Sequence, residues 1–416
     1  MPLLPSWVAS ANRPDTPFPL NNLPYGVFST ADSPPRCGVA IGDMILDLAA
    51  ADAAGMIGLG EGLFDQPRWN GVMALGPDAW HSLRRLLTAL LAEDAEDRAI
   101  LEPCLVPMAD ARLHLPFTIS EFTDFYASRH HATNVGTMFR GAENALPPNW
   151  PHMPIGYNGR ASTVVVSGTE VIRPRGQLMP PGATAPAFGA SRKLDYELEL
   201  GAVVGTGSSM GQGVTVDQAD AMIFGYVLLN DWSARDIQAW EYQPLGPFQA
   251  KAFATTISPW IVTAAALAPF RCPTPPRAVP LLPHLADTGP ALFDITLCAS
   301  LTPENGTTET ICETNFAEMY WSPAQMLAHH SSSGCAMTPG DLLGSGAVSG
   351  AEPHQRGCLL ERTWNGAEPL AFRDGTRRSF LHDGDTITLT GAAHGDGYGI
   401  GFGECSGRIR PARETP

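Results

Sequence analysis

The feature that most restricts the fold of this chain is a series of short strand-like segments separated by glycine and proline. The segments STVVVSG, LELGAVVG, LFDITLCAS and DTITLTG are rich in β-branched and aliphatic residues. The 42 glycines and 38 prolines are spread over the 416 residues without a repeat, as is typical of turns between strands. Few of these segments alternate with helices. The order therefore favours a mainly β (α+β) sandwich or roll over a doubly wound parallel sheet.

Local patterns add a hairpin and several helices to this β-rich outline. The segment 38–50, GVAIGDMILDLAA, predicts two strands around a Gly-Asp turn. Apolar residues at helical spacing predict a helix over 80–100, and the prolines that follow place a domain boundary near residue 116. We expect further helical structure over 215–240, with Asp217 as a cap signal in its early part, and over 322–334, where Ser322 is a suitable N-cap.

Charge and cysteine content exclude several classes of protein. The formal net charge is −16 and no basic cluster is present, which disfavours nucleic acid as a partner. Eight cysteines occur without a CxxC pair, which disfavours a zinc site or a dense disulfide framework. The sequence has neither a signal-peptide pattern nor an apolar run long enough for a membrane span. We therefore expect a soluble cytoplasmic protein.

One strand-like segment, LDYELEL at 194–200, places carboxylates on alternate positions. Asp195, Glu197 and Glu199 would line one face of a strand, with apolar side chains on the other. In most strands such a face is simply exposed to solvent. Here three like charges lie ~6–7 Å apart without a basic residue between them, an arrangement that favours a bound cation. Carboxylate oxygens select Mg²⁺ or Ca²⁺ rather than zinc.

A second polar pattern lies in NDWSARDIQAWEYQPLGPFQAKAFATT, residues 230–256. Asp231, Arg235, Gln238 and Tyr242 are spaced to form one stripe if the segment is helical. The simple alternative is an exposed face with an Asp–Arg ion pair worth ~0.3–0.5 kcal/mol. The surrounding apolar residues favour a lined pocket instead. Lys251, alone in a neutral run, is either solvated or a cation of that pocket.

The segment DFYASRHHATNVG brings an acid, a tyrosine and two histidines together. Asp124 could join the carboxylates as a ligand of a hard cation, which does not favour imidazole. A nearby histidine is then better placed as a general base. The residue types alone do not distinguish His130 from His131. The GSSMG sequence around Ser209 lies in a long Gly/Ser loop, so it does not predict a nucleophile elbow.

Eight segments together resemble the fumarylacetoacetate hydrolase family, in order and nearly from end to end. They are NLPYGVFST, GVAIGDMILDL, YASRHHATNVGTMFRG, GRASTVVVSGT, LDYELELG, FGYVLLNDWSARDIQAWEYQPLGPF, KAFATTISPW and GDGYGIGFG. The resemblance implies a small N-terminal SH3-like barrel, residues 1–116, and a larger C-terminal mixed β-sandwich roll, residues 117–416, that carries catalysis and dimerises. It also implies hydrolysis of the carbon–carbon bond of 4-fumarylacetoacetate to fumarate and acetoacetate, the last step of tyrosine breakdown.

The same resemblance implies roles for individual residues. His131 matches the general base and Glu361 the acid that orients it, while Arg235, Gln238 and Lys251 match the oxyanion-stabilising group. The family's substrate-contact motif reads SGAVSG here, so Ala347 replaces a threonine, and one hydroxyl contact worth ~0.5–1.5 kcal/mol is absent. The other implied contacts are Tyr126, Arg140, Gln238 and Tyr242 for the substrate; Asp124, Glu197, Glu199 and Asp231 for Ca²⁺; and Asp231, Lys251 and Thr255 around Mg²⁺, with Mn²⁺ as an alternative ion.

Two other functions are compatible with these residues. A sister activity, such as acylpyruvate hydrolysis or oxaloacetate decarboxylation, would use a similar site, although such relatives usually have shorter chains without the full SRHHATNVG and EYQPLGPF segments. A non-catalytic scaffold would use the acids only to hold a stabilising metal, and chelation would then unfold it.

Overall fold

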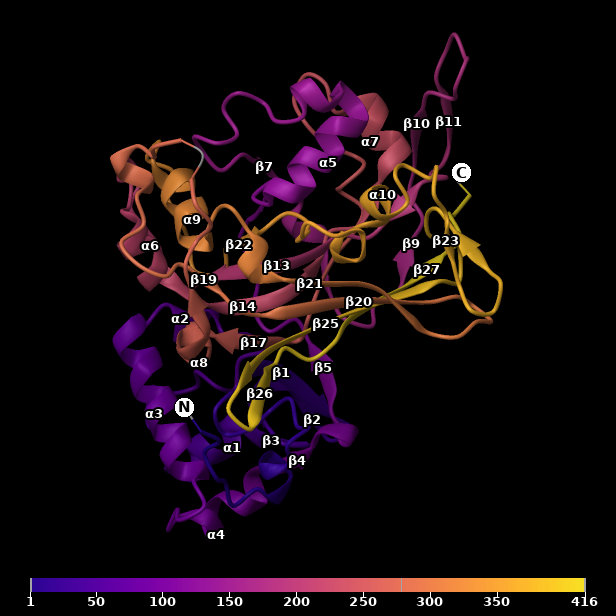
Figure 1. The fold of residues 1–416 in the computed structure, drawn as a ribbon. Helices are drawn as coiled ribbons and strands as arrows, with labels where there is room; N and C mark the ends of the chain where they lie inside the picture. The colour runs from indigo at the N-terminus through magenta and orange to yellow at the C-terminus, as the bar shows by residue number, and fades with distance from the viewer. Residues whose placement is uncertain (1, 278, 415–416) are drawn as a thin grey trace.

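The computed structural model describes residues 2–277 and 279–414, and its largest element is a 13-stranded sheet (Figure 1). Most strand pairs are antiparallel, with parallel pairs at β16–β8 and β22–β6. The prediction of a mainly β fold is confirmed. The strands of this sheet are β1 (Tyr25–Thr30), β2 (Ser33–Ile41), β3 (Met44–Asp47), β4 (Leu105–Pro107), β5 (Arg112–His114), β6 (Phe122–Phe125), β7 (Gly156–Asn158), β8 (Val164–Val166), β13 (Leu198–Val204), β14 (Ile223–Asn230), β16 (Thr255–Ile257), β17 (Trp260–Thr263) and β22 (Leu342–Gly344).

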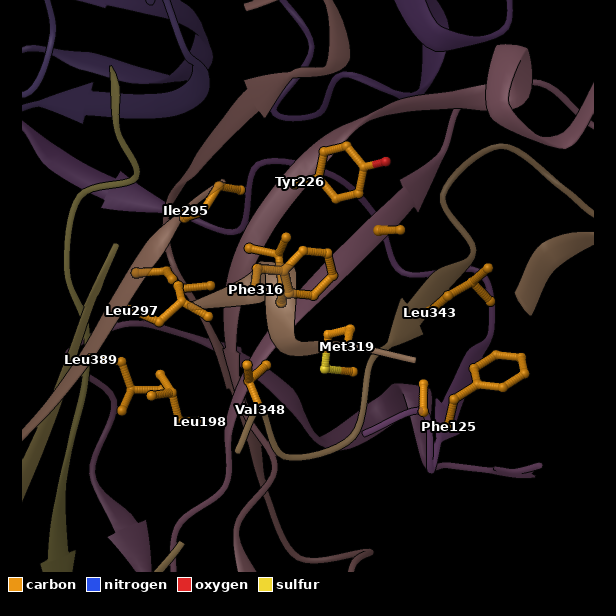
Figure 2. Close-up of a cluster of buried hydrophobic side chains, with 14 of the residues drawn as sticks. Phe125, Leu198, Tyr226, Ile295, Leu297, Phe316, Met319, Leu343, Val348 and Leu389 are labelled. Atoms are coloured by element: carbon orange, nitrogen blue, oxygen red, sulfur yellow. The ribbon is translucent and has the colours of Figure 1, made fainter. Parts of the chain in front are cut away.

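A six-stranded sheet packs against the middle of the large one. Leu198 of β13 and Tyr226 of β14 lie in the same apolar cluster as Leu297 and Leu389 from the smaller sheet (Figure 2). This cluster is the main core, and burial of its side chains holds the two sheets together. The smaller sheet contains β9 (Val171–Ile172), β20 (Thr296–Thr302), β21 (Glu309–Asn315), β25 (Thr386–Gly395), β26 (Tyr398–Gly401) and β27 (Cys405–Arg410).

Helices lie around the sheets, and the short two-stranded pair at the upper right projects outward (Figure 1). As predicted, Ser322 caps the helix that starts at Pro323, because its hydroxyl accepts the Gln325 N–H. The helices are α1 (Leu48–Ala53), α2 (Asn70–Met73), α3 (Pro77–Leu91), α4 (Arg98–Leu101), α5 (Arg129–Arg140), α6 (Val216–Met222), α7 (Arg235–Glu241), α8 (Ala264–Leu267), α9 (Pro323–Ser331) and α10 (Leu359–Arg362). The two-stranded pairs are β10 (Arg175–Leu178) with β11 (Ala187–Ala190), β12 (Leu194–Asp195) with β15 (Ser233–Ala234), β18 (Arg271–Cys272) with β19 (Leu292–Phe293), and β23 (Leu370–Ala371) with β24 (Arg377–Arg378).

The N-terminal strands continue the sheet that carries the rest of the fold. The predicted hairpin forms between β2 and β3, and Gly42 takes the left-handed conformation at its turn with φ of 59°. Strand β1 pairs with β17, so that Tyr25 lies opposite Ile261. The Tyr25 ring stacks on Trp69 and contacts Phe224 of β14. The SH3-like barrel and the division into residues 1–116 and 117–416 stay predictions.

The prediction of a helix throughout residues 215–240 is wrong in its middle. Helix α6 ends at Met222, the chain then forms the strand β14, and only from Arg235 does a second helix, α7, begin. All eight residues of β14 are buried, with Leu228 in the main core and Phe224 in a second core. A strand buried on both faces reads as a continuous apolar run, which periodicity alone does not distinguish from a buried helix.

Other local features of the structure bear on the remaining sequence patterns. The cysteines are all free thiols. The chain around Ser209 is a loop, and Gly401 in GDGYGIGFG lies where a Cβ would come within 3.0 Å of the Pro17 Cα. Over the described residues, the helices are too short or too polar to cross a membrane.

Candidate active site

Four buried carboxylates meet at one end of the central strands. Ligand oxygens of Asp124, Glu197, Glu199 and Asp231 lie within 4.8 Å of one another. Asp124 comes from β6, Glu199 from β13, Glu197 from the residue before β13, and Asp231 from the residue after β14. The pairing explains their convergence, because β13 lies between β14 and β22, and β22 in turn pairs with β6. The structure thus brings together the four acids that the sequence suggested as metal ligands.

The charge balance of this cluster fits a divalent cation. Asp124 Oδ1 and Glu199 Oε1 are buried and have no hydrogen-bond partner among the described atoms. Burial and the neighbouring carboxylates raise the pKa of both Asp124 and Glu199 well above the ordinary values. Buried carboxylate oxygens of this kind need a cation or a proton. Oxygen donors at this spacing suit a hard metal ion, so the cluster can hold one.

The backbone leaves room for such an ion. A Cβ added at Gly344 on β22 would lie 2.7 Å from Asp124 Oδ1 and 2.9 Å from Glu199 Oε2. Any side chain at this position would therefore occupy the space between these two carboxylates. Glycine is therefore needed at position 344 because a side chain would collide with the carboxylates, and not because the backbone forms a turn there.

Lys251 is buried beside the carboxylates rather than solvated. Its Nζ donates to Glu197 Oε2 at 2.5 Å and to Asp231 Oδ2 at 2.6 Å. Burial alone would lower the pKa of Lys251, but the two carboxylates raise it above the ordinary value. Thr255 donates to the other oxygen of Asp231 at 2.8 Å. The ammonium has no lone pair, so its side chain can serve only as a donor and as a charge.

His131 forms a buried pair with Glu361. Nδ1 of His131 lies 2.5 Å from Glu361 Oε2, and Nε2 lies 3.8 Å from Glu197 Oε1. Ser128 caps α5, which carries His131 in its first turn. Burial alone would raise the pKa of Glu361, but His131 and hydrogen bonds from Asn134 and other donors hold it below the ordinary value. Glu361 is therefore a carboxylate that can fix the imidazole in one tautomer.

The neighbouring histidine has a different environment. The side chain of His130 is 36% exposed, and its Nε2 lies 3.5 Å from Glu318. The imidazole that faces the carboxylates therefore belongs to His131.

The cavity next to the carboxylates has a volume of about 440 Å³. Tyr126, Arg140, Gln238 and Tyr242 line it, as do His131, Arg235 and Lys251. Within the described part of the chain, Ala347 is fully buried and does not line this cavity, whereas the adjacent Gly346 does. The opening is apolar as well as charged, with Phe139, Pro244 and Leu245 among its walls.

The prediction that Asp231, Arg235, Gln238 and Tyr242 form one helical stripe is wrong at both ends, although the last three line the cavity. Helix α7 covers Arg235 and Gln238, while Asp231 precedes it and Tyr242 is its C-cap. The chain turns between β14 and α7, so Asp231 reaches the carboxylate cluster and Arg235 points at Glu197 from another side. Arg235 Nη2 donates to Glu197 Oε1 at 2.7 Å, and Nη1 to Gln238 Oε1 at 3.1 Å.

Three polar residues of the site were not predicted. Tyr157 donates its hydroxyl to Asp231 Oδ2 at 2.9 Å, and Asn134 and Ser349 each donate to Glu361 at 2.9 Å. Asn134 lies three positions after His131 on α5, a spacing that places both on one helix face and could have revealed it. Tyr157 and Ser349 come from short segments without such a local signal.

Comparison with known proteins agrees with this geometry. The family model described as fumarylacetoacetate hydrolase C-terminal matches residues 120–410, and the one described as fumarylacetoacetase N-terminal matches residues 21–116. The chain is 49% identical over 407 residues to the fumarylacetoacetase of Mus musculus, which covers 96% of this chain and 97% of the relative. It is 48% identical over 425 residues to that of Arabidopsis thaliana, with 99% and 100% covered.

The fold is also similar to that of a solved fumarylacetoacetate hydrolase from psychrophilic Exiguobacterium antarcticum. The TM-score is 0.52 at 17% sequence identity, with 94% of this chain and 100% of the other covered. From the two family models and the identity over nearly the whole length, the chain belongs to the fumarylacetoacetate hydrolase family.

Proposed function

We propose that this protein hydrolyses the carbon–carbon bond of 4-fumarylacetoacetate to fumarate and acetoacetate, the final step of tyrosine breakdown. The observation that carries the proposal is the buried His131–Glu361 pair next to four converging carboxylates. The relatives that match nearly the whole chain are fumarylacetoacetases. The substrate is a 1,3-diketone with a carboxylate at each end, and such a compound requires activated water, donors for an oxyanion and cations for its charges.

His131 acts as the general base. Glu361 accepts a hydrogen bond from Nδ1–H and thereby leaves the Nε2 lone pair directed toward the carboxylate side of the cavity. Nε2 takes a proton from water as the water oxygen attacks a ketone carbon. The oxyanion then collapses to the new carboxyl group of fumarate, the carbon–carbon bond breaks, and its electron pair passes to the departing acetoacetate carbon. The proton held on His131 Nε2 is returned to that carbon.

Arg235, Gln238 and Lys251 stabilise the oxyanion formed by that attack. Lys251 uses two of its three protons on Glu197 and Asp231, which leaves one donor for the substrate. Gln238 keeps its amide NH₂ available because its Oε1 accepts from Arg235. One donor aimed at an oxyanion is typically worth ~3–4 kcal/mol of activation free energy.

Tyr126, Arg140, Gln238 and Tyr242 contact the substrate. The Arg140 guanidinium suits a terminal carboxylate, and the rings of Tyr126 and Tyr242 suit the planar enol and alkene parts. Ala347 lacks the hydroxyl of the family's threonine, so any contact from this position is apolar.

Ca²⁺ is the proposed ion for Asp124, Glu197, Glu199 and Asp231. Mg²⁺, with Mn²⁺ as an alternative, is proposed near Asp231, Lys251 and Thr255. A divalent ion would supply Lewis-acid polarisation and a template for the diketone. The two buried carboxylate oxygens without partners support its presence.

The family also suggests a homodimer in the cytoplasm, with an N-terminal unit of residues 1–116 and a catalytic unit of residues 117–416. Light scattering on the purified chain tests the dimer, and limited proteolysis near residue 116 tests the division.

Spectrophotometry with purified protein tests the reaction. Fumarylacetoacetate absorbance should fall to that of its two products, and a chelator should slow the loss while the fold persists. Acetylpyruvate is the comparison substrate. Faster turnover of acetylpyruvate would favour acylpyruvate hydrolysis, and no turnover of either compound, with unfolding on chelation, would favour a scaffold.

A further inference from the structure

Asp195 is a buried acid that the proposed chemistry does not use. It was grouped on sequence with Glu197 and Glu199, but it is not part of the carboxylate cluster among the described residues. The chain leaves regular strand geometry between β12 and β13, so the Asp195 side chain turns away from the two glutamates. Its side chain is fully buried, and a buried carboxylate needs strong donors.

The donors come from two separate parts of the active site. Asp195 Oδ2 accepts Arg235 Nε at 2.8 Å and the Leu360 N–H at 2.9 Å. Oδ1 accepts the Leu359 N–H at 2.7 Å and the N–H of the adjacent Tyr196 at 2.9 Å. One carboxylate thus connects the guanidinium at the start of α7 with the first two N–H groups of α10.

The bonds to α10 replace a missing cap. The first N–H groups of a helix have no partner within it and need an external acceptor. Cys358, the N-cap residue of α10, makes no capping bond with its side chain. Asp195 supplies the acceptor from 164 positions away in sequence, and Glu361 lies in the same single turn of helix. The position of Glu361 therefore depends on Asp195.

The bond to Arg235 has a second consequence. Arg235 reaches Glu197 with Nη2 and Gln238 with Nη1, so its Nε bond to Asp195 sets the plane in which both contacts form. The fixed fork of a guanidinium makes such an orientation effective.

We propose that Asp195 is a positioning residue that fixes the His131–Glu361 pair and the Arg235 guanidinium in their positions relative to each other. It does not touch the cavity. The inference rests on the proposed function for its kinetic effect, but the geometric part can be measured without any substrate.

The first test is Asp195→Asn, which keeps the shape but presents an amide NH₂ to groups that are themselves donors. We expect kcat to fall by roughly 10- to 100-fold, as for other residues that orient an active-site group, with little change in KM. The downfield proton NMR signal of His131 Nδ1–H, identified by its loss in His131→Gln, should shift or broaden. A wild-type kcat together with an unchanged His131 signal would overturn the proposal.

Asp385→Asn is the matched control. Asp385 is also fully buried and accepts two bonds from one arginine, Arg378, and one from the His382 N–H, but these partners do not belong to the active site. This control should lose stability and keep the His131 signal and kcat. Equal kinetic losses in both variants would mean that Asp195 acts only through general stability, which contradicts the proposal.

A second variant covers the case in which Asp195→Asn does not fold. Leu359→Pro removes the Leu359 N–H, one of the two N–H groups that Asp195 Oδ1 accepts, and also replaces the buried leucine side chain. Proline is tolerated at the first helical position, and Cys358 before it is extended with φ of −152° and ψ of 161°. The His131 signal should change in this variant as well; an unchanged signal would refute the connection to α10.

A double-mutant cycle with Glu361→Gln decides whether the two acids act together. If Asp195 works through Glu361, the loss in kcat of the double variant should be smaller than the product of the single losses. Fully multiplicative losses would contradict the proposal. If the wild-type protein does not hydrolyse fumarylacetoacetate, the proposed function fails, while the NMR comparison still decides the role of Asp195.

Discussion

His131 Nδ1 lies 2.5 Å from Glu361 Oε2, although the two residues are 230 positions apart. The same carboxylate accepts bonds from Asn134 and Ser349, so it has little freedom to rotate. An imidazole whose Nδ1–H donates a hydrogen bond to a fixed acceptor presents the Nε2 lone pair in a defined direction. In this chain that direction is toward Glu197 and the cavity, as a base for water requires.

Replacement of His131 by glutamine should remove most of the activity. A general base contributes about 10²–10⁴-fold to a rate, and we expect kcat to fall by that factor with metal binding retained. The adjacent His130→Gln is the control, because this side chain is partly exposed and faces Glu318. The assay is initial-rate hydrolysis of fumarylacetoacetate. Similar rates for the two variants would show that His131 is not the base.

Glu361 should make the free energy of unfolding depend on pH in the acidic range. Its pKa in the folded protein lies below the ordinary 4.5, so its stabilisation is fully present above 4.5 and is lost as pH falls through the folded pKa. Glu361→Gln should therefore be less stable than wild type near neutral pH. This gap in unfolding free energy between the two proteins should narrow below pH 4.5. Urea unfolding across this range measures it. A gap of constant size would mean that Glu361 keeps its ordinary pKa.

Lys251 should be needed for stability most when no metal is bound. Lys251→Met leaves Glu197 and Asp231 buried without their ammonium partner, and breaking a buried ion pair costs about 3–5 kcal/mol of unfolding free energy. Added Ca²⁺ or Mg²⁺ should recover part of this loss. The chain's other lysine provides the control, Lys193→Met, because Lys193 makes an exposed contact with Asn365. Thermal unfolding of both variants is measured with and without metal. Equal changes in Tm on addition of metal in the two variants would contradict this prediction.

Gly344→Ala should weaken metal binding although no ligand residue is replaced. The added methyl group would lie 2.7 Å from Asp124 Oδ1, and the carboxylates would have to move apart. We expect Ca²⁺ affinity to fall by roughly 10- to 100-fold, as for other changes that displace ligands. Gly289→Ala is the control, since its Cβ would meet nothing within 4 Å. Calorimetry with equal Ca²⁺ affinities for both variants would argue against a metal at this position.

The sequence predicted residues whose signal is local. The alternation in LDYELEL is real from Leu198 onward, where Leu198 faces the main core and Glu199 faces the carboxylates. Ser322 was found because a cap and its helix are neighbours in sequence. Asp195 was misjudged because a single irregular residue pair, 196–197, changed the direction of its side chain. Tyr157 was missed because no local sequence pattern indicates that its strand, β7, pairs with β6.

The pairing of β1 with β17 has a consequence for truncated forms of the chain. A fragment that started after residue 116 would lose the strand opposite Trp260 and Ile261, together with the aromatic stack of Tyr25 and Trp69 over Phe224. Unpaired strand edges next to apolar surface recruit strands of other molecules. Such a fragment would therefore self-associate instead of working as a smaller enzyme. Residues 1–116 cover strand edges and apolar surface that would otherwise cause the rest of the chain to aggregate.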